Sequence, residues 1–292
     1  MKESNKKIAI TPNSSTSLVR VDNSISITDK ILKEHNFKLH NHKTLLMENW
    51  NNIFPDEWKE ILELHIILSK LGINVDTKCS IHHQYKSLFG VDYTYNDKTD
   101  LNHLKSLKTL NLRTKIEIND LSPISFFENL IEFQYWNESD SIVGIEKIGG
   151  FLKLEYLHIY APKVLNLNFL INNLKLKKLT LITGDIIDYT FLKKLEGLEY
   201  LYFSTDKLTK HHPIFTLLNL KTLTVMNCNQ VEDIDQFINL SNLEELTLYY
   251  VNITNINFLK RLEIKSLRIR NGGLKNEEID WIKNNIPDLI LL

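Results

Sequence analysis

A six-residue pattern of the form L-x-x-L-x-L occurs nine times between residue 107 and the end of the sequence. The copies read LKTLNL, LIEFQY, LEYLHI, LKKLTL, LEYLYF, LKTLTV, LEELTL, IKSLRI and IPDLIL. They begin at residues 107, 130, 154, 176, 198, 220, 243, 264 and 286, so successive copies lie 21 to 24 residues apart. A period of this length indicates a repeat protein, in which each coil of the chain stacks on the previous one.

Each copy of the pattern predicts a short β-strand. Because side chains alternate along a strand, positions 4 and 6 of the motif share one face, and positions 3, 5 and 7 share the other. One copy cannot bury its apolar side chains alone, whereas stacked copies bury them together and pair their strands in parallel. A coil of about 22 residues has no room for a long helix. The sequence therefore predicts an α/β solenoid with a parallel sheet of about nine strands, joined by short helical or extended segments.

This repeat resembles the leucine-rich repeat, in the short class found in phosphatase-regulatory subunits and bacterial internalins. The resemblance covers about residues 101–292 and implies a concave sheet with a convex outer side. That class usually carries Asn at position 9, where it bonds the backbone between coils. Position 9 here holds Lys115, Glu138, Pro162, Gly184, Asp206, Cys228, Val251 and Gly272. Coil stacking is therefore expected to be less regular, and Cys228 is expected to fill an inward-facing slot rather than act as a nucleophile.

The first hundred residues lie outside the repeats. Residues 1–17 are rich in Ser, Asn and Lys and are expected to form a flexible tail. Residues 18–100 are predicted to form an α-rich N-terminal cap, since a solenoid needs a cover over its first coil. Within them, residues 54–72 have the pattern of a helix, with Pro55 in the first turn, Gly72 at the stop and one apolar face. The alternative is a small, separate α+β module with a function of its own.

Composition excludes several classes of function. The chain has 292 residues, with 35 basic and 36 acidic side chains, so it lacks the basic excess of a general nucleic-acid binder. Its two cysteines do not form a disulfide framework, which favours a reducing compartment. The N-terminus has no apolar signal region, and the longest apolar stretch is interrupted by charges. We therefore expect a soluble, cytoplasmic protein without membrane partners, and the Asn-, Lys- and Ile-rich vocabulary favours a bacterial source.

The sequence predicts no enzyme and no cofactor. Nucleotide-binding, nucleophile-elbow and zinc-protease motifs do not occur in it. Two histidine clusters, HNFKLHNH and CSIHH, lack the paired spacing of a zinc site, so no metal is predicted. His211 and His212 are expected on a convex loop, exposed to solvent. The enzymatic alternative is an active module in residues 18–100, with the repeats selecting its substrate and a first set of candidates in Cys79, His82 and His83.

The concave face carries the candidate binding residues. Of the 24 side chains at positions 3, 5 and 7 of the first eight copies, six are aromatic, against 10% for the whole chain. Tyr, Trp, Met and Arg are also the types enriched at protein interfaces. The competing interpretation is that Tyr and Thr suit any β surface and stabilise one another across strands. The predicted partner-binding residues are Trp136, Tyr156, His158, Tyr160, Tyr200, Tyr202, Met226, Tyr249, Tyr250, Arg268 and Arg270.

These observations predict a non-enzymatic interaction module that binds another protein on its concave face. Narrower alternatives are an immunity protein that neutralises a toxin and a bacterial effector directed at a host. The segment NEEIDWIKNNIPDLILL predicts a short helix and a last strand whose edge is open. This edge is expected either to stay unpaired and weakly protected or to pair with another copy of the chain in a weak homodimer.

Overall fold

The computed structural model describes residues 54–55, 57–58, 62, 104–112, 118–184, 186–251, 253, 255–269 and 274–291. The chain divides into two compact units, residues 1–100 and residues 101–292. Almost all of the described residues belong to the second unit.

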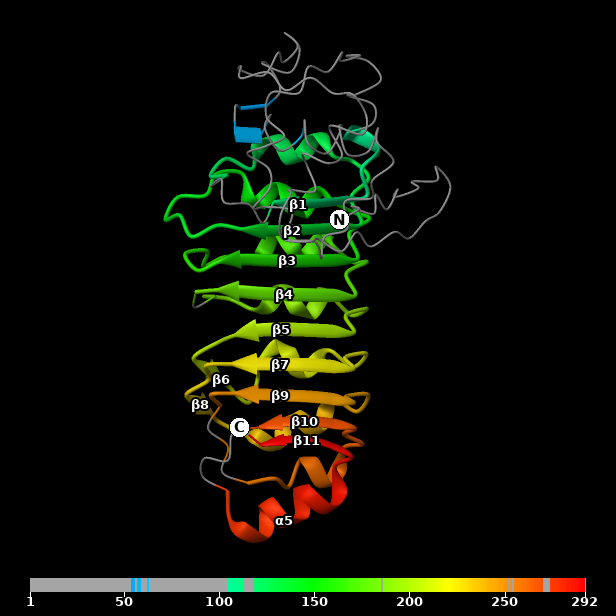
Figure 1. The fold of residues 1–292 in the computed structure, drawn as a ribbon. Helices are drawn as coiled ribbons and strands as arrows, with labels where there is room; N and C mark the ends of the chain where they lie inside the picture. The colour runs from blue at the N-terminus through cyan, green and yellow to red at the C-terminus, as the bar shows by residue number, and fades with distance from the viewer. Residues whose placement is uncertain are drawn as a thin grey trace, which may run out of the picture. The chain divides into compact units, whose positions relative to one another are not determined.

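Within the described part of residues 101–292, nine parallel strands form one sheet and follow one another in chain order (Figure 1). Every strand begins at position 3 of a repeat motif, and neighbouring strands pair position for position, as Leu157 does with Leu179 and Leu179 with Leu201. The predicted nine-stranded solenoid is therefore confirmed. The strands are β1 (Thr109–Leu112), β2 (Glu132–Trp136), β3 (Tyr156–Ala161), β4 (Lys178–Thr183), β5 (Tyr200–Ser204), β7 (Thr222–Met226), β9 (Glu245–Tyr249), β10 (Ser266–Ile269) and β11 (Asp288–Leu291).

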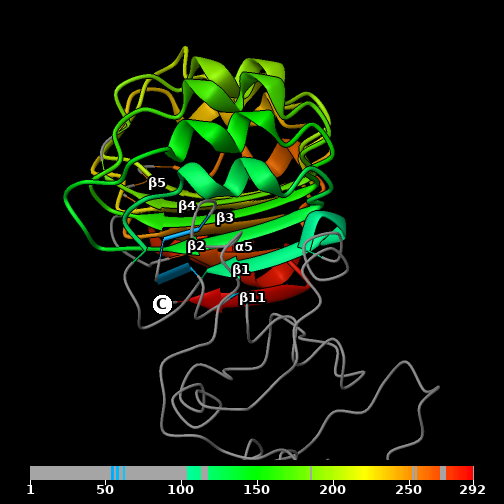
Figure 2. The ribbon, with the colours of Figure 1, turned by 90° about the horizontal axis from the view of Figure 1, so that it is seen from above.

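Short 3-10 helices form the outer layer of the solenoid. A 3-10 helix rises about 2.0 Å per residue against about 1.5 Å in an α-helix, so it returns the chain within a short coil. Figure 2 shows this layer on one side, while the strands arc so that the opposite face of the sheet is concave. The helices are η3 (Ser122–Phe126), η4 (Ile145–Gly150), η5 (Asn168–Asn172), η6 (Thr190–Lys194), η7 (Pro213–Thr216), η8 (Ile234–Asn239) and η9 (Leu259–Arg261).

The core lies between the sheet and the 3-10 layer. Side chains at positions 1, 4 and 6, such as Leu154, Leu157 and Ile159, are buried completely. Phenylalanines of the return segments meet them from the other side, and the rings of Phe237 and Phe258 lie 5.4 Å apart. The alternation in burial along β3 leaves its positions 3, 5 and 7 on the concave face, as the motif predicts.

Asparagines do bond the coils together, but at a different position of the repeat. Asn129, Asn219 and Asn242 each precede the first leucine of a motif, and their side-chain amides donate to backbone carbonyls of the previous coil at 2.7 to 3.0 Å. Inside the solenoid, the Asn173 amide donates to the carbonyls of Ile148 and Phe151 at 3.1 and 3.0 Å. These bonds take the place of the position 9 asparagines that the repeat class usually has, and the described strands pair in register without them.

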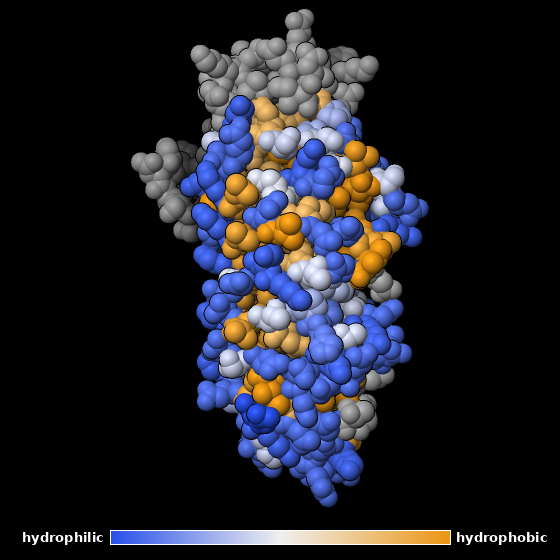
Figure 3. Space-filling view, turned by 180° about the vertical axis from the view of Figure 1, so that it is seen from behind, coloured by the Kyte–Doolittle hydropathy of each residue, from blue (hydrophilic) through white to orange (hydrophobic). Residues whose placement is uncertain are grey.

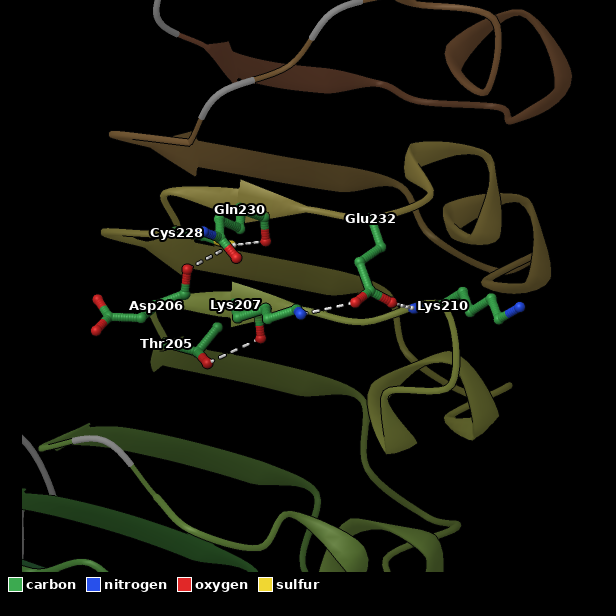
Figure 4. Close-up of polar contacts among 7 residues, drawn as sticks. All are labelled: Thr205, Asp206, Lys207, Lys210, Cys228, Gln230 and Glu232. Atoms are coloured by element: carbon green, nitrogen blue, oxygen red, sulfur yellow. Dashed lines mark hydrogen bonds and ion pairs between the residues drawn. The ribbon is translucent and has the colours of Figure 1, made fainter.

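Cys228 occupies position 9 and is buried. Its Sγ lies 3.2 Å from the carbonyl oxygen of Gln230 and 3.7 Å from that of Asp206 in the previous coil (Figure 4). Burial raises the pKa of the thiol above its usual range, which disfavours a nucleophilic thiolate. The side chain faces inward, as predicted. It lies beside a two-stranded parallel ribbon of β6 (Lys207–Leu208) and β8 (Gln230–Val231), where Lys207 pairs with Glu232 at 2.7 Å.

A row of alternating charges runs along the amino ends of the strands, at position 2 of the motif. In chain order, the row reads Glu155, Lys177, Glu199, Lys221, Glu244 and Lys265. Three ion pairs join its neighbours at 2.8 to 2.9 Å. The hydrogen bond to Glu155 raises the pKa of Lys177, and the bond from Lys221 lowers the pKa of Glu199. If a coil stacked on the next coil but one, like charges would lie side by side. The row therefore favours the observed order of the coils.

Few residues of the first unit are described. Glu57, Trp58 and Leu62 are helical, and Trp58 and Leu62 are buried, which agrees with the apolar face predicted there. The rest of residues 54–72 and the predicted tail lie outside the described residues. At the other end, α5 (Asn276–Asn285) precedes β11, so the predicted short helix and last strand are confirmed. No helix among the described residues is long and apolar enough to cross a membrane.

Candidate functional site

The position 7 row runs along the carboxyl ends of the strands on the concave face. Its described members are Trp136, Tyr160, Ile182, Ser204, Met226 and Tyr249, which come from β2, β3, β4, β5, β7 and β9. Within each half of the row, neighbouring strands place these residues side by side in register. All six side chains are partly exposed. The row contains no charged residue between Trp136 and Tyr249.

An aromatic stack forms the first half of this row. The rings of Trp136 and Tyr160 lie parallel, with centroids 3.7 Å apart and an interplanar angle of 8°. The Tyr160 hydroxyl donates to Oε1 of Glu138 at 3.4 Å. Burial, together with the Glu138 carboxylate, raises the pKa of Tyr160, so the hydroxyl stays protonated and able to donate at neutral pH.

The second half of the row is joined by sulfur, hydroxyl and ring contacts. The Tyr202 hydroxyl donates to Sδ of Met226, and the Ser204 hydroxyl donates to the Met226 carbonyl at 3.3 Å. Tyr249 and Tyr250 meet edge to face, with centroids 4.4 Å apart. Tyr250 is 49% exposed and has a φ of 54°, in the left-handed region that a bulky side chain seldom adopts. The backbone conformation thus holds a large aromatic ring at the surface.

Positions 3 and 5 form the rest of the concave face. Tyr156, His158, Tyr200 and Tyr202 are half-buried there, and burial raises the pKa of Tyr200 and Tyr202. Arg268 is exposed on β10. Ten of the eleven predicted binding residues are thus described, at or beside the concave face. Arg270 lies outside the described residues, and partner binding by the whole set stays a prediction.

The prediction that His212 is a solvent-exposed histidine is wrong. His212 is 6% exposed, and its Nδ1 accepts a hydrogen bond from the backbone N–H of Ile214 at the start of η7. Its ring packs against Tyr189 and Phe203, at centroid distances of 4.7 and 5.8 Å. Burial lowers its pKa to about 4. The signal in the sequence was Pro213, which favours a helix start and so a capping side chain just before it.

A second apolar feature is a set of exposed aliphatic side chains in the loops after the strands, in the turns before them and in η5, which the repeat pattern did not predict. Figure 3 shows the face opposite the sheet, mainly hydrophilic, with hydrophobic residues gathered in its upper half. Six of the nine most exposed large apolar residues fall between residues 143 and 187, and Ile187 is 81% exposed. Any test of the concave face must therefore include this feature. Its members are Val143, Leu152, Leu165, Ile171, Leu174 and Ile187.

Metal and nucleophile chemistry finds no support in the part of the chain that the structure describes. No group of three or more His, Cys, Asp or Glu side chains there has the geometry to hold a metal ion. The histidine clusters at His35, His40 and His42 and at Cys79, His82 and His83 lie outside the described residues. The enzymatic alternative for residues 18–100 is thus neither supported nor contradicted.

Comparison with solved structures supplies the fold. Internalin C2 from Listeria monocytogenes str. 4b F2365 is 22% identical, with a TM-score of 0.58 over 83% of this chain and 96% of that one. The chain has the leucine-rich-repeat fold. Two weaker similarities are to an internalin (inlF) from the same strain and to the plant peptide hormone receptor RGFR1 in complex with RGF2. The first is 19% identical, with a TM-score of 0.49 over 82% of this chain and 90% of that one. The second is 16% identical, with a TM-score of 0.42 over 64% of this chain and 36% of that one.

No protein-family model and no curated protein matches the sequence. At these identities, the leucine-rich-repeat likeness extends to the fold alone. The function is therefore inferred from the side chains of the concave face.

Proposed function

We propose that this leucine-rich-repeat solenoid is a non-enzymatic module that binds a partner protein on its concave face. The observation that carries the proposal is the uncharged, partly exposed position 7 row from Trp136 to Tyr249, extended by Tyr250. Six strands about 4.8 Å apart spread the row over roughly 24 Å, which suits an interface of about 800 Å² per partner.

Cross-strand stabilisation explains only part of this row. The Trp136–Tyr160 stack is a cross-strand pair of the kind that stabilises any sheet. The same cannot be said of Tyr250, which follows β9 and is 49% exposed. Its positive φ belongs to the turn after the strand, because Asn227 at the same position of the previous coil has a φ of 56°. An apolar row that the solenoid leaves half exposed is better explained by contact with a partner.

The test is capture of the partner from the source organism by the full-length chain. Replacing Tyr160 and Tyr249 together by Thr keeps a β-forming residue in each strand and removes both rings. We expect this variant to lose capture of the partner while its circular dichroism and melting curve stay close to wild type. The matched control is Leu152→Thr with Leu218→Thr, which removes two leucines that are 63% and 57% exposed in turns before the strands. Undiminished capture by the tyrosine variant, with loss of capture in the control, would contradict binding on the concave face and indicate that the partner contacts the turns before the strands.

The captured protein also distinguishes the narrower predictions. A co-encoded toxin would identify an immunity protein, and a host protein would identify an effector. A second copy of this chain, which β11 would pair with along its edge, would instead identify a homodimer, and sedimentation at increasing concentration measures that association directly.

A further inference from the structure

The concave face carries three rows of side chains that differ in chemistry. From β2 to β9, position 7 is uncharged, and position 5 carries amide, imidazole or hydroxyl groups. The charges lie at position 3, where Glu132, Lys178 and Glu245 alternate in sign along the solenoid axis. The face is thus apolar along the carboxyl ends of the strands and charged along their amino ends.

Among the described residues, no ion pair includes any of the three position 3 charges, although Lys178 lies close enough to Glu199 to help lower the pKa of that carboxyl. The described ion pairs lie in the position 2 row, on the 3-10 layer and in the loops after the strands, and none includes Glu132, Lys178 or Glu245. Glu132 accepts a hydrogen bond from the neutral amide of Gln134 at 2.7 Å, which leaves its charge in place. A partner with opposite charges at these three points would satisfy them.

We propose that the concave face binds an amphipathic α-helix of the partner, lying along the solenoid axis with its apolar side on the position 7 row. The helix presents a basic, an acidic and a basic side chain to Glu132, Lys178 and Glu245 in turn. This inference rests on the function proposed above, because it names the element that fills the same surface. Helix-in-groove recognition of this kind reads anchors at i, i+3, i+4 and i+7.

Spacing favours a helix over an extended segment. A helix advances about 5.4 Å per turn and the sheet about 4.8 Å per strand, so five steps cover about 27 Å and about 24 Å respectively. An extended chain presents same-face side chains about every 6.7 Å and would drift by roughly 10 Å over the same five steps. Only the helix therefore places about one anchor over each strand.

The width of the face agrees with this placement. Positions 3 and 7 of one strand are about 13 Å apart, close to the 10–12 Å diameter of a helix with its side chains. A helix on the apolar row thus extends its flank over the charged row. Two strand steps separate Glu132 from Lys178, and three separate Lys178 from Glu245. These steps of about 10 Å and about 14 Å correspond best to helix residues i, i+7 and i+18.

The test uses a phage-displayed library of random 20-residue peptides, selected on the full-length chain. We expect binders with apolar residues at helical spacing and an acidic residue on the flank that meets Lys178. Charge reversal by Lys178→Glu should weaken a selected peptide about tenfold, and repeated selection on this variant should replace the acidic residue by a basic one. Lys175→Glu, a reversal three residues earlier in the same coil, is the matched control and should change affinity less than twofold.

The outcomes distinguish this inference from the proposed function. Binders that are lost on Tyr160→Thr with Tyr249→Thr but lack a helical period would overturn the helix and keep the concave site. Binders unaffected by the double substitution would overturn both the site and the helix. A library that yields no binder, or binders indifferent to Lys178→Glu, would overturn the helix with its charge pattern.

Discussion

His212 is the clearest case of a single residue whose role depends on the folded environment. It accepts the N–H of Ile214, packs on two aromatic rings and leaves Nε2 buried without a hydrogen-bond partner. A neutral imidazole tolerates this environment, whereas an imidazolium would lose the Nδ1 acceptor and bury a charge. The histidine thus couples the stability of the coil behind β5 to pH.

Acid should destabilise the protein through His212. The pKa of this imidazole is lowered from 6.5 to about 4 in the folded chain. Between about pH 6.5 and pH 4, the unfolded chain therefore binds a proton that the folded chain does not. The stabilising contribution is complete above pH 6.5 and is lost as the pH falls, by roughly 3 kcal/mol over the whole range. Urea unfolding at several pH values measures it.

The variant His212→Asn isolates this effect. The Asn side-chain oxygen can still accept the Ile214 N–H, but it does not titrate, so stability should depend less steeply on pH than in the wild type. The neighbouring His211 is exposed, and His211→Asn is the matched control that should keep the wild-type slope. Equal slopes in all three proteins would show that His212 is not the titrating group.

At the scale of the element, successive 3-10 helices approach each other closely. Gly149 and Gly150 are adjacent at the end of η4, yet their surroundings differ. A Cβ added to Gly149 would lie 2.5 Å from the carbonyl oxygen of Phe169 in η5, whereas one added to Gly150 would meet nothing within 4 Å. The first glycine is therefore required by the packing of neighbouring coils, and the second is not.

These two glycines give a matched pair of alanine substitutions. Gly149→Ala should lower the free energy of unfolding by about 2 kcal/mol, because backbone must move to admit the methyl group. Gly150→Ala should be neutral or stabilising by about 0.5 kcal/mol, because it restricts the unfolded chain. Thermal or urea unfolding compares them directly. Equal losses in both variants would contradict the close approach of η4 and η5.

The alternating charges at position 2 act between elements as well. Lys221→Glu would place three carboxylates in succession, with Glu199 and Glu244 on either side. We expect a small drop in melting temperature, roughly 2 °C, because the pairs are exposed. The drop should shrink in 0.5 M salt, where exposed charges are screened. A drop that is independent of salt would mean that the row does not act through charge.

For the whole molecule, the period of the repeat predicted the features that recur in every coil. The nine strands and their parallel order follow from L-x-x-L-x-L, because burying leucines in a column allows only one stacking register. The contacts that differ from coil to coil were not predictable in this way. The asparagines that bond neighbouring coils lie just before the motif and not at position 9. Ile187 is exposed, although nothing in the sequence around it distinguishes it from a core isoleucine.

In the candidate site too, the repeat predicted which residues face outward but not how their side chains pack. Register alone placed Tyr160 and Tyr249 on the concave face, since position 7 must oppose positions 4 and 6. The stack of Trp136 on Tyr160 and the left-handed conformation of Tyr250 depend on ring orientation and loop geometry, which a single sequence does not determine. The cytoplasmic location, the bacterial source and the role of residues 18–100 stay predictions.

The central claim is that a partner protein contacts the position 7 row, and photo-crosslinking in the source organism tests it most directly. A benzophenone amino acid would replace Tyr160 in one strain and Leu152 in another, the latter in a more exposed turn before β3. The predicted result is a cross-linked adduct of defined mass from position 160 and none from position 152. An adduct from position 152 alone, or none from position 160 while the wild-type chain still captures its partner, would contradict the claim.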